Sequence, residues 1–171
     1  MKLFVEDMLE TVKFVPVSLF IALVFALIYI VICIMRKKEL KPARTALIIL
    51  DVVYFATVLQ IALLSRVEGS VTEIDFTLLG RYTDDLRGRM YIYENILMTI
   101  PMGILLPLTF KKRFKFLDTL LCTFMLSILI EMIQLAFRCG FCQLSDVIMN
   151  VLGGFIGYLI YKVFKLLGGK R

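Results

Sequence analysis

Five long apolar stretches alternate along the chain with short segments that carry most of its charged residues. Each stretch has about 20 residues, the length at which a helix crosses the hydrocarbon core of a bilayer. The stretches are 15–35, 46–64, 92–110, 116–137 and 147–167. The first contains no charged residue, whereas the second contains Asp51 and the third contains Glu94 near its start. The pattern predicts an all-α, polytopic membrane protein, a helical bundle with about five transmembrane helices.

Two segments outside these stretches are long enough to have a role of their own. Residues 1–14 mix apolar and charged positions at a spacing that suits either a helix lying in the membrane interface or an extension of the first span. Residues 65–91 form the only long connection and contain Arg81, Arg87 and Arg89 among several acids. A connection of this length in a small protein is usually functional or disordered. We expect residues 1–171 to form a single membrane domain.

The distribution of Lys and Arg predicts how the chain is oriented in the membrane. Of the 20 Lys and Arg residues, seven fall on the side of the N-terminus and thirteen on the opposite side, where Lys162 and Lys165 at the end of the last stretch are included. Cytoplasmic segments of membrane proteins carry an excess of Lys and Arg. We therefore expect the N-terminus and the segments 65–91 and 138–146 to face outward, and the C-terminus to face the cytoplasm.

Composition narrows the classes of function. Hydrophobic residues make up 60% of the chain, far above the roughly 45 to 50% of soluble proteins. The mean hydropathy is also high, at +0.89. The net charge of +6 does not indicate nucleic-acid binding, because the basic residues cluster at the ends of apolar stretches, where they act as topology signals. The chain contains no His, which excludes imidazole-based catalysis and the usual zinc sites. We expect neither a metal nor a cofactor.

Polar side chains within the last three spans and at their ends converge on one end of the bundle. Such side chains cost several kcal/mol in an apolar span unless they are paired or face water, so each is a functional candidate. In the predicted orientation they all lie in the outer third of the membrane: Glu94, Asn95, Glu131, Gln134, Arg138, Asp146 and Asn150. Within the fourth and the fifth span, helical spacing places them on one stripe. The connection between these spans is short, which predicts an antiparallel hairpin whose polar stripes face each other.

The charge of this cluster is unbalanced. Three carboxylates, those of Glu94, Glu131 and Asp146, accompany a single cation, Arg138. A proton retained on one acid, an arginine of the 65–91 segment or a bound cationic ligand can restore the balance. We favour loop arginines that fold over the cluster.

Two kinds of role fit such a cluster, packing and ligand binding. In the first, salt bridges and amide hydrogen bonds only fix the helices against one another. In the second, the cluster is an outward-facing pocket for the head group of a membrane lipid or a lipid-linked cell-wall precursor, in which Arg contacts phosphate and the acids contact hydroxyls or amines.

Paired carboxylates also permit chemistry or transport. Glu131 and Asp146 can act as general acid and base in a membrane enzyme that modifies an envelope lipid or precursor. The same acids can serve a small transporter. Since no nucleophile or metal motif accompanies them, we expect binding rather than catalysis.

Small residues and prolines mark places where helices approach each other or bend. The last span contains the glycines Gly153, Gly154 and Gly157, and the third span contains Pro101, Gly103 and Pro107. The glycines permit close helix approach next to the polar stripe. The prolines remove backbone N–H groups and predict a kinked or partly unwound third helix. Such a kink either opens a cavity beside the acidic end of that helix or serves packing alone.

Cys139 and Cys142 form a Cys-x-x-Cys pair in the predicted outward-facing connection. An outward-facing segment permits a disulfide, so the pair fits unpaired thiols, a local disulfide, or a redox or metal pair. The βαβ context of a thioredoxin-like site is missing.

Three spaced motifs in residues 92–162 resemble the VanZ-like family of bacterial membrane proteins. The motifs are N-x5-P-x-G from Asn95, E-x2-Q-x3-R from Glu131 and D-x3-N-x2-G from Asp146. The resemblance implies a small multi-pass protein of the cytoplasmic membrane in Gram-positive-type envelopes. Some members are associated with low-level resistance to teicoplanin and related lipoglycopeptides. The resemblance implies no established reaction and no oligomeric state.

Overall fold

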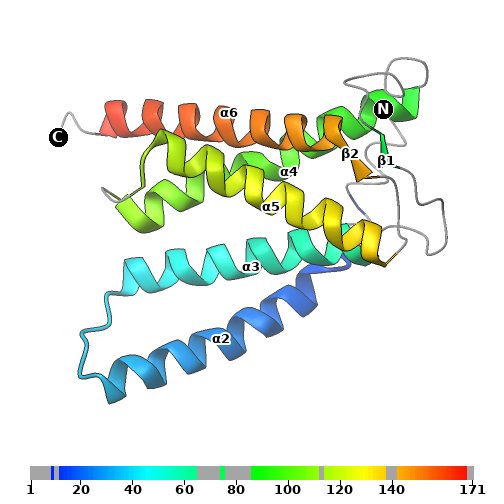
Figure 1. Ribbon diagram of the computed structural model, residues 1–171. Helices are drawn as coiled ribbons and strands as arrows, with labels where there is room; N and C mark the ends of the chain where they lie inside the picture. The colour runs from blue at the N-terminus through cyan, green and yellow to red at the C-terminus, as the bar shows by residue number, and fades with distance from the viewer. Residues whose placement is uncertain are drawn as a thin grey trace. The chain divides into compact units, whose positions relative to one another are not determined.

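The computed structural model describes residues 9, 12–64, 74–75, 86–111, 114–137 and 142–168. Five helices in these ranges are long and apolar enough to cross a membrane (Figure 1). They are α2 (Val15–Met35), α3 (Pro42–Leu64), α4 (Leu86–Phe110), α5 (Phe116–Ala136) and α6 (Leu144–Gly168). Two short strands accompany them, β1 (Ile74–Asp75) and β2 (Cys142–Gln143). The predicted helical, multi-pass architecture is confirmed, and the strand pair is an addition to it.

Three helices begin earlier than their apolar stretches. α3 begins at Pro42, α4 at Leu86 and α6 at Leu144. Hydropathy measures how much of a helix suits lipid, whereas the helix itself continues as long as its backbone hydrogen bonds do. Pro42 suits the first position of a helix because it has no N–H group to leave unpaired there. Residues 86–91 thus belong to α4 and not to a connection, and residues 65–73 and 76–85 lie outside the described residues.

The chain divides into two compact units, Met1–Ser65 and Arg66–Arg171. The first contains α2 and α3, and the second contains α4, α5, α6 and the strand pair. Of the N-terminal segment 1–14, only residue 9 and residues 12–14 are described, so its placement in the interface stays a prediction.

In the first unit, small side chains form the seam of α2. Its buried residues are Ser18, Ala22, Ala26 and Cys33. Large apolar side chains of the same helix point away from the seam, and Phe20 is 65% exposed. Small residues on the contact face and large apolar residues on the outer face are typical of membrane helices.

One cluster of hydrogen bonds joins α2 to α3. The Ser18 hydroxyl is fully buried and donates to the Phe14 carbonyl at 3.1 Å. Its oxygen accepts from Gln60 Nε2 at 2.7 Å and lies 2.8 Å from Thr57 Oγ1. The amide of Gln60 also reaches the Ala56 carbonyl, and the Thr57 hydroxyl also reaches that of Val53. Both α3 donors therefore have a second acceptor within their own helix.

The turn after α2 contains a strained lysine. Lys37 has a φ of 51°, in the left-handed region that favours glycine. Its N–H donates to the Ile34 carbonyl, and the N–H of Lys38 donates to the Cys33 carbonyl at 2.9 Å. These two bonds form a Schellman motif, which ends the helix. Lys111, directly after α4, has a similar φ of 55°.

In the second unit, α5 is polar inside and apolar outside. Five of its six buried residues are polar: Thr119, Thr123, Ser127, Glu131 and Gln134. By contrast, Leu117 is 73% exposed and Met132 is 63% exposed. Lipid tails are as apolar as leucine, so leucine gains little by leaving them, and small or hydrogen-bonding residues hold the helices together instead.

Glycines bring α4 and α6 into backbone contact. A Cβ atom on Gly157 would collide with the Ile100 carbonyl oxygen, and one on Gly103 would collide with the carbonyl oxygen of Gly154. A Cβ atom on Gly154 itself would meet the Thr123 side chain of α5. The glycines of α6 thus pack mainly against α4. Gly154 also contacts α5, the helix that forms the hairpin with α6.

The two prolines of α4 do not interrupt it. The helix is continuous from Leu86 to Phe110 with Pro101 and Pro107 inside it, so α4 is not unwound there, and the kink that the sequence also allows stays a prediction. Each proline removes one N–H donor, and the hydrogen bonds on either side are sufficient to keep the helix intact.

Candidate functional site

Three helix ends and the strand pair meet at one end of the second unit (Figure 1). α4 and α6 begin there, and α5 ends there. β1 pairs in parallel with β2, so that Ile74 lies opposite Cys142 and Asp75 opposite Gln143. Part of the 65–91 segment is thereby attached to the connection between α5 and α6. Six of the seven predicted polar residues are described and lie toward this end, and we call them the polar cluster: Glu94, Asn95, Glu131, Gln134, Asp146 and Asn150.

Glu131 connects the end of α5 to the start of α6. Its side chain is 3% exposed, and its Oε2 atom accepts a hydrogen bond from the backbone N–H of Gln143 at 2.9 Å. Gln143 directly precedes α6, whose first N–H groups have no acceptor within the helix and favour negative charge nearby. Asp146 lies in the first turn of α6 and is 2% exposed. Both carboxylates therefore lie at the same electropositive helix end.

Asn150 joins all three helices. Its side-chain Nδ2 donates to Ser127 Oγ of α5 at 2.8 Å. Its main-chain carbonyl accepts from Thr99 Oγ1 of α4 at 2.7 Å. The residue is only 1% exposed, and its Oδ1 atom has no hydrogen-bond partner among the residues that the structure describes. Asn150 is thus held in place by its neighbours, and its Oδ1 atom can still accept a hydrogen bond.

The other predicted residues differ in how far they are described. Gln134 is 2% exposed, and Glu94 and Asn95 are half-buried on α4. Arg138 and Cys139 lie outside the described residues, so the cation of the cluster and the three alternatives for the Cys139–Cys142 pair stay predictions. In the described ranges, no group of three or more Cys, Asp and Glu residues could hold a metal ion.

Comparison with known proteins agrees with the three motifs. The family model of VanZ/LLP1 proteins matches residues 20–165, which include residues of both units. The chain belongs to the VanZ/LLP1 family.

A relative of this VanZ/LLP1 protein is Protein VanZ of Enterococcus faecium. It is 34% identical over 86 residues, which are 50% of this chain and 48% of the relative. The chain therefore spans about half the length of the curated relative it matches. No solved structure matches the chain.

The hydrogen-bond network of this VanZ/LLP1 protein also includes hydroxyl side chains. The sequence analysis did not single them out. Thr99 and Ser127 bond to Asn150, and Thr123 meets Gly154. The signal was present in α5, where Thr119, Thr123, Ser127 and Glu131 recur at every fourth residue. An acid that continues a stripe of hydroxyl residues at this spacing indicates a polar face more strongly than the acid alone.

Proposed function

We propose that this multi-pass membrane protein binds the head group of an envelope lipid or of a lipid-linked cell-wall precursor with its polar cluster. One observation supports this most: Glu131, Gln134, Asp146 and Asn150 are each 3% exposed or less at one end of helices whose outer faces are apolar. Polar groups of this kind are costly in a membrane and are usually retained for a function.

The chemistry of the cluster suits a head group rich in hydroxyls or amines. Carboxylate and amide oxygens accept hydrogen bonds from such groups, and charge-assisted bonds are the stronger ones. Arg138 follows Glu131 at seven residues, a spacing that predicts a common stripe with Glu131, and in this proposal it contacts the phosphate. The ligand enters from the outer leaflet of the cytoplasmic membrane, in the orientation that the Lys and Arg distribution favours.

The biological role follows from the family. By resemblance to VanZ-like proteins, we infer that binding or masking of the ligand reduces the action of teicoplanin and related lipoglycopeptides. Catalysis by Glu131 and Asp146 and transport through the same acids are the alternatives, and no observation on the described residues favours either of them over binding.

Lipid retention tests the proposal. Wild type, Arg138→Ala and the control Lys162→Ala are purified in mild detergent and analysed by native mass spectrometry and lipid extraction. Lys162 is exposed on α6 and is not part of the cluster. We expect wild type and the control to retain a head-group-bearing lipid or precursor, and Arg138→Ala to lose it while staying monodisperse.

A conservative variant separates binding from packing. Glu131→Gln keeps an oxygen that can accept the Gln143 N–H but removes the charge, and we expect about tenfold weaker retention. If Arg138→Ala and Glu131→Gln change thermal stability but not the bound lipid, the cluster is a packing device and the proposal is wrong. Teicoplanin susceptibility of a sensitive Gram-positive host that expresses each variant then tests the biological role.

A further inference from the structure

A second polar site lies in the first unit, where α2 leads into α3. A pocket of about 370 Å³ opens there, within the range of about 300 to 1,000 Å³ typical of small-molecule sites. Residues of both helices and of their connection line it. None of them belongs to the polar cluster, so this pocket is independent of the function proposed above.

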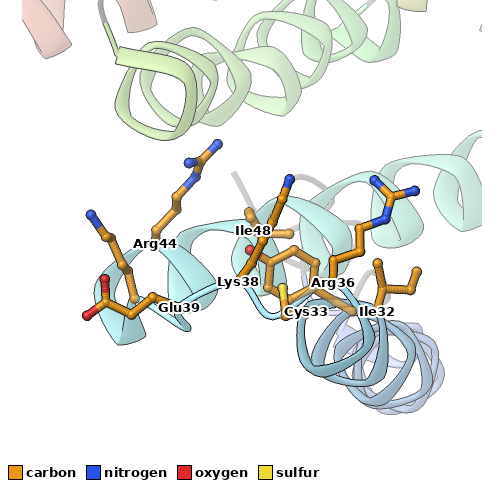
Figure 2. A pocket seen from close by; sticks show the side chains of 9 residues that line it. Ile32, Cys33, Arg36, Lys38, Glu39, Arg44 and Ile48 are labelled. Atoms are coloured by element: carbon orange, nitrogen blue, oxygen red, sulfur yellow. The ribbon is translucent and has the colours of Figure 1, made fainter.

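We call this cavity the basic pocket, because the charged residues at its rim are mostly cations. Its cations are Arg36, Lys38, Lys41 and Arg44, and its only acid is Glu39. Figure 2 shows that Arg36, Lys38 and Arg44 extend to the same side of the connection, whereas Glu39 points away from them. α3 begins at Pro42, so the electropositive N-terminus of a helix adds to this charge. The pocket therefore favours an anion.

The wall of the pocket is apolar. Ile32 and Ile48 line it from α2 and α3. Cys33 adds a buried thiol, and the ring of Tyr29 completes the wall. An inorganic anion would use only the charged rim. A charged rim next to an apolar wall instead matches a molecule with a phosphate joined to a hydrocarbon body.

We infer that the basic pocket binds the phosphate of an anionic membrane phospholipid, with the glycerol and the first acyl carbons against Ile32 and Ile48. The α2–α3 connection lies on the side that the Lys and Arg distribution predicts to be cytoplasmic, where anionic lipids attract basic segments. The Schellman turn at Lys37 holds Lys38 at the end of α2, so the rim has a defined shape and is not only a run of basic residues.

Lipid titration of the 171-residue chain tests this inference. Wild type in mild detergent is titrated with phosphatidylglycerol, with phosphatidylcholine and, separately, with inorganic phosphate, and bound molecules are counted by native mass spectrometry. We compare Lys38→Gln/Arg44→Gln with the control Lys162→Gln/Lys165→Gln. Both pairs remove two charges from exposed positions, so neither should disturb folding.

The inference predicts one tight phosphatidylglycerol per chain. Affinity should fall about 30-fold in Lys38→Gln/Arg44→Gln and less than about threefold in the control. Glu39→Gln, which removes the only acid of the rim, should strengthen binding about fivefold.

Three results would overturn the inference. Equal binding of phosphatidylcholine would mean that the lipid charge is not recognised. An equal loss in both double variants would mean that only total charge matters. Displacement of the lipid by inorganic phosphate at similar concentration would identify a soluble anion as the ligand.

Discussion

The two units of this VanZ/LLP1 protein join their membrane helices in different ways. In the first unit, a seam of Ser and Ala and one hydrogen-bond cluster around Ser18 connect two helices, and the charge gathers at their connection. In the second unit, glycines bring backbones into contact, and Asn150 bonds to both neighbouring helices. The difference separates two kinds of polar site: one is exposed at a helix connection, and the other is built into a packed interior.

The largest expected effect comes from filling the backbone contact. Gly157→Val should destabilise the second unit by about 3 kcal/mol or more, because the new side chain collides with the main chain of Ile100, which cannot rotate away. Fluorescence-detected size-exclusion chromatography after detergent extraction should show loss of the monodisperse peak.

A matched glycine provides the control. Gly168 ends α6, and a Cβ atom there would meet nothing within 4 Å. Gly168→Val should therefore elute as wild type does. A normal peak for Gly157→Val would show that α4 and α6 are further apart than described here, and the contrast between the units would disappear.

Removing one buried polar side chain from each unit compares how much the hydrogen bonds of the two units contribute to stability. Asn150→Ala should cost about 1 to 2 kcal/mol, because Ser127 loses its donor. Ser18→Ala should cost only about 0.6 kcal/mol, because Gln60 and Thr57 each keep an acceptor in their own helix. Unfolding in mixed micelles measures both values. A larger loss for Ser18→Ala than for Asn150→Ala would contradict this expectation.

The smallest expected effect concerns the turn of the first unit. Lys37→Gly should stabilise the protein by up to about 1 kcal/mol, because glycine adopts a φ of 51° without strain. Arg36→Gly is the control, since its φ of −87° suits any residue and glycine there only adds flexibility to the unfolded chain. Thermal midpoints should rise for the first variant and fall for the second.

Much of this arrangement could be predicted from the sequence. Apolar length is a direct requirement of the bilayer, which is why α2 has the predicted bounds of Val15–Met35. Helical spacing likewise predicts one face for Asp146 and Asn150, and both are buried. The starts of α3, α4 and α6 could not be predicted from hydropathy, because charged or small polar residues continue a helix beyond the apolar core.

Other features depend on contacts between elements, which the spacing of residues along the sequence does not determine. Gly153 and Gly154 are adjacent, so they point about 100° apart on the helix, and the sequence does not say which neighbour each one meets. Gly153 lies against α4, and Gly154 lies against Thr123 of α5. The β1–β2 pair has two residues on each side, too few to show an alternating pattern.

The glycine contact between α4 and α6 also has a mechanical consequence. A screw motion of one helix by a single residue, a rise of about 1.5 Å with a turn of about 100°, would bring the side chain of Met102 or Ile104 to the place of Gly103. No room exists there, because Gly103 already touches the main chain of Gly157. α4 and α6 therefore cannot shift register by one residue while they stay in contact, and we expect a conformational cycle of this unit to move α5 or the connections around this pair.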